Sequence, residues 1–432
     1  MLGLLDELKG LQNNIRVGII GTGWMGSRLL RQTTITPGID CVAIADIIID
    51  RAINAAEQIN RDYRIVHSSS ELNTAVSDGK LAVCENGELV AGCSSLDVLL
   101  ESTNSIAAGG HHGMLALESQ NHLIMVNKEA DLMFGNYLMN LAQGNRLVYT
   151  SCDGDEPAVN KRLLNEVELM GFEVVMAGNI KGYLDRYANP TSIKPEADKR
   201  LLDYRMSTLT TDGTNLSIEM AVLANGIGFQ VATPGMYGPR VVDIHEIFDF
   251  FDFKEIRNQH IAVVDYVLGA TPKGGVFVIG YCADKHQQLT LNIIPSQMGP
   301  APFYLFYRPY HLVNFEAMLT VAEVVLRNRP VLKPDFGFKT NVYAYAKTDL
   351  EAGDTLDGFG GYTCYGIIEN CAEDPPNPGL PICLAEDVKL RREIKRDEKI
   401  NMEDIMIDEG NFVYQLYKKS VACSREMSPT YV

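Results

Sequence analysis

Apolar and polar positions alternate in blocks between residues 16 and 150. Short β-branched runs, each closed by a glycine or a polar turn, are separated by stretches with helical periodicity. The apolar runs lie at 16–20, 42–44, 97–101 and 122–126, with a further one at 147–149. Strands that alternate with helices form a parallel sheet covered on both faces. The pattern therefore predicts an α/β fold that begins with a doubly wound parallel sheet of the Rossmann type, in a domain spanning 1–150.

The segment between Asn73 and Cys93 interrupts this alternation. It carries two turn signals, at Asp78-Gly79 and at Asn86-Gly87. We interpret the segment as an insertion with a small hairpin on the flank of the sheet.

The pattern changes after residue 150. Helical periodicity recurs at 157–171, 214–225 and 315–328, and β-type runs lie at 276–281 and 303–306, among turns rich in glycine and proline. This mixture predicts an α+β substrate or catalytic domain spanning 151–335. Beyond it, short strand–turn–strand patterns predict a small, mostly β module over 336–432.

Charge and composition narrow the classes of partner. The chain has 38 basic and 55 acidic residues, a formal net charge of −17, with 46% hydrophobic and 22% charged residues. An acidic surface repels nucleic-acid phosphates and anionic lipids, so we expect no nucleic acid and no membrane as partner. The partner expected instead is a small-molecule substrate. Because closed symmetric dimers are the commonest oligomers, a homodimer is also expected.

The nine cysteines stand singly, without a CxxC pair or a zinc-type spacing. Scattered thiols in a long chain are typical of reduced core residues, and the first 14 residues are too charged for a signal peptide. These features predict a cytoplasmic protein. His111 and His112 are adjacent, so on a helix they point apart, and no metal site is assigned to them.

The strongest chemical signal is the sequence GTGWMG at 21–26, between a predicted strand and a predicted helix. In a dinucleotide-binding loop the first glycine permits a tight turn, the second admits the pyrophosphate, and the third lets the helix pack on the strand. We therefore assign Gly21, Gly23, Trp24, Met25 and Gly26 to cofactor binding. A purely structural glycine-rich turn is the alternative.

Asp46 ends the second predicted strand, 20 residues beyond Gly26. A carboxylate at this position accepts hydrogen bonds from the adenosine ribose hydroxyls and repels a 2′-phosphate. The cofactor is therefore NAD or NADP, with NAD favoured. A solvated aspartate at a strand end is the alternative.

Two later strand ends carry polar residues, Thr103 with Asn104 and Asn127 with Lys128. Ligands of doubly wound sheets bind outside the carboxyl ends of the strands, so these residues are candidates for the nicotinamide end. Lys128 could donate a proton to a carbonyl oxygen during hydride transfer. It could equally be a surface lysine on a loop.

Three clusters in the middle region are ambiguous singly. Asp155 and Glu156 precede a predicted helix, where acids complement the helix dipole, but they could also hold substrate hydroxyls or a divalent metal. Lys181 lies in a predicted flexible turn and could hold an anionic group. Arg308 matches a carboxylate or phosphate bidentately, and His311 could act as acid or base. Together they suggest a small anionic substrate.

The chain resembles the deoxyxylulose phosphate reductoisomerase-like oxidoreductases. The resemblance runs over most of the chain, on GTGWMG (21–26), NKEAD (127–131), GDEP (154–157), GFEVVMAGNIKG (171–182), PEADKR (195–200), EMAVLANGIG (219–228), PGMYGPR (234–240), GVFV (275–278) and YRPYHL (307–312). It implies a homoserine-dehydrogenase-like nucleotide domain, a catalytic domain and a C-terminal SAF-type β module. The strand–turn–strand segments at 347–356 and 388–405 fit that module. The family includes enzymes that rearrange and reduce deoxyxylulose phosphate with NADPH.

We therefore predict an NAD(P)-dependent oxidoreductase that acts on a small oxygenated, anionic substrate such as a sugar phosphate or a hydroxy acid. Lys128 or Lys181 would polarise or protonate the substrate oxygen, and Arg308 would hold the anionic end. One alternative is a homoserine-dehydrogenase-like hydroxy- or amino-acid dehydrogenase. Another is a non-catalytic dinucleotide sensor whose SAF-type module contacts a partner.

Overall fold

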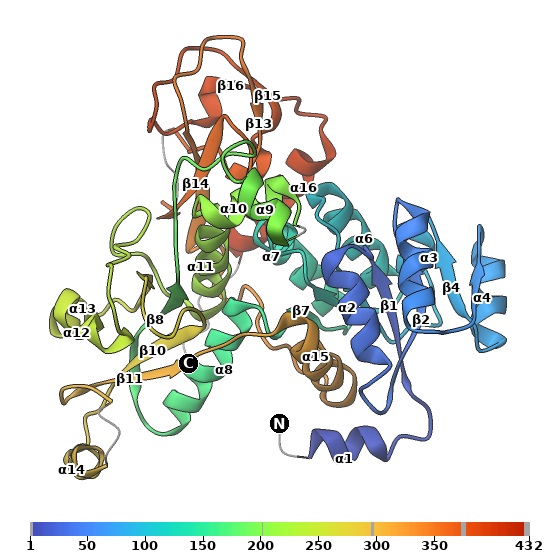
Figure 1. The fold of residues 1–432 in the computed structure, drawn as a ribbon, viewed down its shortest axis with the longest axis horizontal. Coiled ribbons are helices and arrows are strands. Elements are labelled where there is room, and N and C mark those ends of the chain that lie inside the picture. Colours follow the sequence, from blue (N-terminus) through green and yellow to red (C-terminus); the bar gives the residue numbers. More distant parts are fainter. Residues whose placement is uncertain (1–2, 201, 295–297, 373–376, 427–432) are drawn as a thin grey trace. The chain divides into compact units, whose positions relative to one another are not determined.

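The computed structural model describes residues 3–200, 202–294, 298–372 and 377–426 (Figure 1). These residues form two compact units. The first comprises residues 3–158, Leu312–Lys333 and 415–426, and the second comprises Val159–His311 and Pro334–Tyr414. This division into two units does not decide the three domains predicted from the sequence, which remain a prediction.

The first unit is built on a seven-stranded sheet whose paired strands are all parallel, in the order β3-β4-β2-β1-β5-β6-β7. The predicted doubly wound α/β fold is confirmed. The strands are β1 (Ile15–Ile20), β2 (Ile39–Ala45), β3 (Tyr63–Ile65), β4 (Leu81–Cys84), β5 (Val98–Glu101), β6 (His122–Met125) and β7 (Tyr149–Ser151). All four residues of β5 are buried, as expected for a strand covered on both faces.

Helices cover both faces of this sheet. They are α1 (Leu4–Lys9), α2 (Trp24–Thr33), α3 (Ile49–Gln58), α4 (Ser69–Ser77), α5 (Gly87–Ala91), α6 (Ile106–Glu118), α7 (Lys128–Gly144), α15 (Val313–Arg327) and most of α16 (Phe412–Glu426). Helix α15, far along the chain, contributes Met318 and Val321 to the same apolar core as Val17 and Ile19. The predicted helix at 315–328 thus belongs to the packing of the first unit.

The predicted hairpin between Asn73 and Cys93 is wrong. The segment contains the end of α4, the strand β4 and the helix α5, and β4 pairs in parallel with β2 and β3. Its two turn signals mark helix ends instead, because the Asn86 side chain caps α5 by accepting from the Glu88 N–H at 2.9 Å. Residues that favour turns also favour helix caps, and the fully buried run Leu81–Cys84 is a central strand.

The second unit contains a four-stranded mixed sheet in the order β11-β10-β8-β9. Its strands are β8 (Glu173–Lys181), β9 (Val263–Leu268), β10 (Val276–Tyr281) and β11 (Phe303–Arg308), with β8 and β9 parallel and the other pairs antiparallel. The helices are α8 (Glu156–Leu169), whose first residues fall in the first unit, α9 (Lys194–Arg200), α10 (Tyr204–Thr211), α11 (Thr214–Ile227), α12 (Ile247–Phe250), α13 (Phe253–Asn258) and α14 (Lys285–Ile293).

Helix α11 is the centre of the second unit. Its residues from Thr214 to Gly226 are all buried, which requires neighbours on every side. On one side lie β8 and β9, and on the other lie the antiparallel strands β12 (Thr340–Ala346) and β14 (Cys364–Asn370). Thr214 Oγ1 accepts from the Gly366 N–H at 2.8 Å, so the C-terminal strands are bonded directly to this helix.

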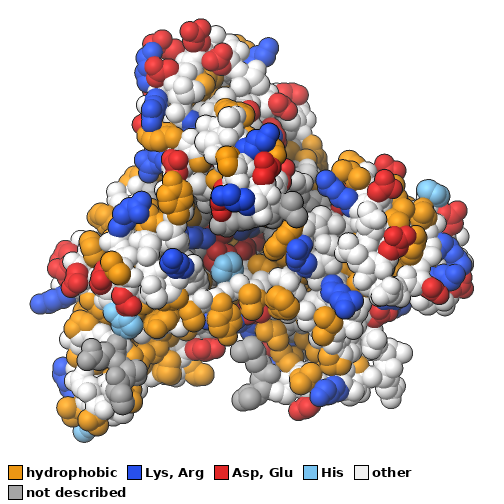
Figure 2. All heavy atoms as spheres, in the orientation of Figure 1, with side chains coloured by type: hydrophobic (Ala, Val, Ile, Leu, Met, Phe, Trp, Pro, Cys, Tyr) orange, Lys and Arg blue, Asp and Glu red, His pale blue; other side chains and the backbone are white. Residues whose placement is uncertain are grey.

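The remainder of the predicted β module contains a three-stranded sheet of β13 (Thr355–Asp357), β15 (Glu386–Leu390) and β16 (Ile405–Met406). Its resemblance to a SAF-type module stays a prediction. None of the described helices has both the length and the apolarity needed to span a bilayer. On the visible face of each unit, acidic and basic side chains are interspersed (Figure 2).

Candidate active site

The glycine loop between β1 and α2 has the backbone geometry that its sequence predicts. Gly21 has φ of 87°, and a Cβ there would lie 2.7 Å from the carbonyl oxygen of Ser102. A Cβ at Gly26 would collide with the carbonyl of Gly21. At Gly23 an added Cβ meets no atom within 4 Å, so the loop is open at the position expected for a pyrophosphate.

The two large residues of this loop point in different directions. Trp24, the chain's one tryptophan, is 53% exposed on the first turn of α2, and the Arg28 guanidinium lies 3.9 Å from its ring centre. Met25 packs instead against the apolar core of the first unit. Trp24 is therefore the more accessible of the two predicted cofactor residues.

Asp46 lies beside the glycine loop and is only 6% exposed, so it is not a solvated strand-end residue. Its Oδ2 accepts from the backbone N–H of Thr22 at 2.8 Å and from the Thr22 hydroxyl at 3.2 Å. Its Oδ1 accepts from the Ile48 N–H at 2.9 Å. A carboxylate has about four lone-pair sites, so these bonds leave it capacity for another donor.

Two of the four predicted nicotinamide-end residues, Thr103 and Asn127, form a hydrogen-bonded cluster with Glu101, a residue that the sequence did not distinguish. Thr103 Oγ1 donates to Glu101 Oε1 at 2.6 Å, and Asn127 Nδ2 donates to Thr103 Oγ1 at 3.4 Å. Asn127 Oδ1 also caps α7 by accepting from the Ala130 N–H at 3.0 Å. Asn104 is exposed on the loop before α6. The sequence signal that could have identified Glu101 is its position as a carboxylate at the end of an otherwise apolar strand.

Lys128 is the first residue of α7, and it is paired. Its Nζ lies 3.5 Å from Asp155 Oδ1, with the two side chains 19% and 18% exposed. The surface-lysine alternative is therefore incorrect: the ammonium sits in a partly buried ion pair.

A buried carboxylate one turn further along α7 fixes this helix to the sheet. Asp131 accepts hydrogen bonds from the hydroxyls of Tyr149 and Ser151, the latter at 2.5 Å. Burial raises the pKa of Asp131 to about 6, although both hydroxyl bonds act in the opposite direction. The network joins the helix of Lys128 to the strand that leads to Asp155.

Lys181 is the last residue of β8, so the predicted flexible turn at this position is wrong. Its Nζ donates to Glu219 Oε2 at 2.8 Å, and Asn179 Nδ2 donates to the same oxygen at 3.0 Å. Asn215, one turn earlier on α11, donates to Glu219 Oε1. Glu219 is 1% exposed, and a buried carboxylate of this kind requires such charged and polar partners.

The polar network of the second unit extends to helix α8. Asn160 on this helix donates to Asn179 Oδ1 at 3.0 Å and is fully buried. Glu156 lies four residues earlier, on the same face of the helix.

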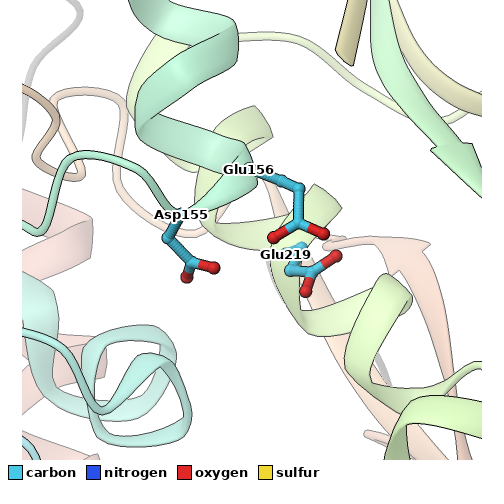
Figure 3. A group of neighbouring side chains, drawn as sticks. All are labelled: Asp155, Glu156 and Glu219. Atoms are coloured by element: carbon cyan, nitrogen blue, oxygen red, sulfur yellow. The ribbon is translucent and has the colours of Figure 1, made fainter. Parts of the chain in front are cut away.

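Asp155, Glu156 and Glu219 form a group of neighbouring carboxylates (Figure 3). Asp155 precedes α8, Glu156 is on its first turn, and Glu219 projects from α11. One carboxylate oxygen of each lies within 4.8 Å of those of the others, which is the spacing of ligands around a cation. Glu219 was not recognised from the sequence, because it lies in the middle of a helix that reads as core.

Arg308 and His311 follow a different strand. Arg308 is the last residue of β11, and its guanidinium lies 4.2 Å from the ring centre of Tyr310. Val276 of β10 pairs with Arg308 on one side and with Asn179 on the other. Arg308 is thus two strands from Asn179 at the same level of the sheet, about 10 Å apart in backbone. His311 lies in the short segment after β11.

Part of this site matches a known family. Residues 154–317 match the family described as "Oxidoreductase DRL, catalytic domain", which is less than half of the chain. The matched stretch contains the candidate site residues Asp155, Glu156, Lys181, Glu219, Arg308 and His311. It agrees with the resemblance predicted for these residues, and it identifies them as similar to the catalytic domain of an oxidoreductase. No curated protein matches the chain.

The solved structures to which the chain is similar include dehydrogenases of low sequence identity. A probable dehydrogenase from Thermotoga maritima is 11% identical, covers 73% of this chain and 90% of its own, and has a TM-score of 0.41. For a dehydrogenase from Chromobacterium violaceum the values are 11%, 74%, 90% and 0.42. For myo-inositol dehydrogenase from Lactobacillus casei, solved with NAD(H) and myo-inositol, they are 15%, 62%, 72% and 0.38. Similarity this low says nothing about activity.

Proposed function

We propose that the protein is an NAD(P)-dependent oxidoreductase that transfers hydride to or from a carbon of a small oxygenated, anionic substrate. The observation that carries this proposal is the glycine loop, open at Gly23 and bonded through Thr22 to the buried Asp46. The similarity of 154–317 to an oxidoreductase catalytic domain supports the same class.

The residues of the first unit fit a dinucleotide. The N–H groups of the first turn of α2 would receive the pyrophosphate, and Asp46 would accept the adenosine ribose hydroxyls. Thr103, Asn104 and Asn127 would line the nicotinamide end. The nicotinamide, when bound, supplies the hydride acceptor or donor. Asp46 favours NAD over NADP, because a carboxylate repels a 2′-phosphate.

Two lysines are candidates for the proton transfer to the substrate oxygen. Lys128 pairs with Asp155, and Lys181 pairs with Glu219. Each ammonium lies partly buried beside a carboxylate, which orients it. A charged donor of this kind would stabilise an oxygen that gains negative charge as hydride arrives at the adjacent carbon. Arg308 would hold the anionic end of the substrate, and His311 is a further acid or base candidate.

The three neighbouring carboxylates of Figure 3 have a second role in this proposal. Carboxylate oxygens at this spacing suit a divalent cation, or donor hydroxyl groups of the substrate. A bound cation would polarise the substrate oxygen.

The proposal is tested by titrating the protein with NAD⁺, NADH, NADP⁺ and NADPH in a calorimeter and by tryptophan fluorescence. NADH should quench the fluorescence of Trp24, because this residue lies within the cofactor loop. Gly23→Ala should fold normally, since its Cβ enters open space, yet bind at least tenfold more weakly, because the Cβ occupies the pyrophosphate position.

Gly144→Ala is the matched control, because a Cβ at that position also meets no atom within 4 Å. It should leave binding unchanged. If the wild-type protein binds none of the four nucleotides, the proposal fails. If it binds them but reduces no aldehyde, ketone, keto acid or sugar phosphate, the non-catalytic sensor is the better description. A homoserine-dehydrogenase-like activity would appear as turnover of amino-acid semialdehydes. The expected homodimer is tested on the same sample by light scattering.

A further inference from the structure

Glu101 is a buried carboxylate with little compensation. Its side chain at the end of β5 is fully buried, and Thr103 donates to Oε1. Oε2 has no hydrogen-bond partner among the described residues. The one basic group paired with it in that part of the chain is His112, whose Nδ1 lies 3.5 Å from Oε1. A buried charge that keeps an unpaired oxygen is unfavourable unless something offsets it.

The position of Glu101 in the sheet places it on one half of the proposed cofactor site. β1 lies between β2 and β5, and Asp46 at the end of β2 marks the adenosine half. The opposite half, over β5 and β6, is then left for the nicotinamide. Glu101 pairs in register with Ile20, directly before the glycine loop, and the adjacent Ser102 donates to the Gly21 carbonyl at 2.8 Å.

The two redox states of a nicotinamide differ by one charge at the ring. The oxidised ring carries a positive charge, and the reduced ring is neutral. A carboxylate near the ring therefore stabilises the oxidised form selectively, and its effect is largest where water is excluded, as it is around Glu101. The cationic ring would also supply the compensation that the buried carboxylate lacks.

We infer that Glu101 sets a preference of this protein for the oxidised over the reduced coenzyme, acting through its charge and not by direct contact. The inference rests on the proposed function and adds to it the redox state that the site favours. Glu101 is fully buried, so it does not touch the cofactor and is not a catalytic residue.

The test compares dissociation constants of NAD⁺, NADH and ADP-ribose for wild type and Glu101→Gln by calorimetry at pH 8. Glutamine keeps the acceptor for Thr103 and removes the charge. We expect the ratio Kd(NAD⁺)/Kd(NADH) to rise about tenfold, as for two unit charges on the order of 10 Å apart at an effective dielectric constant of about 20. ADP-ribose has no nicotinamide, so its affinity should not change.

Glu88→Gln is the matched control. Glu88 is a carboxylate of the same unit that pairs with His111, but it is exposed, and its loss should leave the ratio unchanged. An unchanged ratio in Glu101→Gln, with all three ligands bound, would overturn the inference and leave the proposed function intact. Absence of binding to wild type would overturn both. If Glu101→Gln does not fold, the wild type decides alone: a preference for NADH of more than about tenfold contradicts a charge effect of the expected size.

Discussion

Lys181 and Glu219 form a partly buried ion pair, with Nζ 2.8 Å from Oε2, although 38 residues separate them in the chain. β8 ends at Lys181, and α11 places Glu219 in the middle of its buried length. Asn179 and Asn215 hold the carboxylate from two further directions. The pair is therefore fixed by two rigid elements of one unit, which is a requirement for a group that delivers a proton to a defined atom.

Lys181→Met should lower kcat by about a hundredfold or more, because it removes the proposed proton donor. The Kd of the dinucleotide should not change, since the cofactor residues lie on other elements. Lys199→Met, which changes an exposed lysine of the same unit, is the control and should retain full activity. Equal loss of cofactor binding and of turnover in Lys181→Met would contradict the assigned role.

Asp46→Ala should weaken NADH binding by about tenfold or more, through the loss of charge-assisted bonds to the ribose hydroxyls. NADPH should lose less affinity, because the same change removes a repulsive charge. Fluorescence titration of Trp24 with both nucleotides measures the two effects. The ribose assignment would be abandoned if both affinities fell by the same factor.

Asp131 should make stability depend on pH between about 4 and 6. Burial raises its pKa to about 6 in the folded protein from 3.8. The folded state therefore holds this proton more tightly than the unfolded chain, so the contribution to stability is complete below about pH 4 and is lost as the pH rises through 6. The shift corresponds to about 3 kcal/mol.

Urea unfolding of Asp131→Asn at pH 4, 5, 6 and 7 checks this relation. The amide cannot ionise, so the free energy of unfolding should fall less steeply with pH than in wild type. Asp50→Asn, at an exposed position of α3, should retain the wild-type slope. A wild-type slope in Asp131→Asn would show that other groups cause the dependence.

A divalent cation should bind at the three carboxylates of Figure 3. We expect Mn²⁺ to bind the wild-type protein, detected by electron paramagnetic resonance of the free ion, and Glu156→Gln to weaken it at least tenfold by removing one oxygen ligand. Glu166→Gln, which changes an exposed acid of the same helix, is the control. If Mn²⁺ does not bind at millimolar concentration, the carboxylates would serve substrate hydroxyls alone.

The sequence was sufficient to predict the features that depend on residues close together in the chain. The alternation of short apolar runs with helical stretches predicted the parallel sheet, because a strand covered on both faces must be apolar throughout. The sequence GTGWMG predicted a loop whose first and third glycines leave no room for a side chain. The spacing between this loop and Asp46 predicted that the aspartate lies beside the loop, where it accepts a hydrogen bond from the Thr22 N–H.

Tertiary structure alone decided which elements face one another. Periodicity predicted the helix that became α15, but an apolar face does not specify its partner. In the structure Met318 of this helix lies in the same apolar core as Val17. The turn residues around β4 had two interpretations, since the same side chains that form turns also cap helices. Glu219 and Glu101 were not distinguished in the sequence. Glu219 is significant because it is buried beside Lys181, and Glu101 because it is buried on the strand next to the glycine loop. Both positions depend on contacts between residues far apart in the chain.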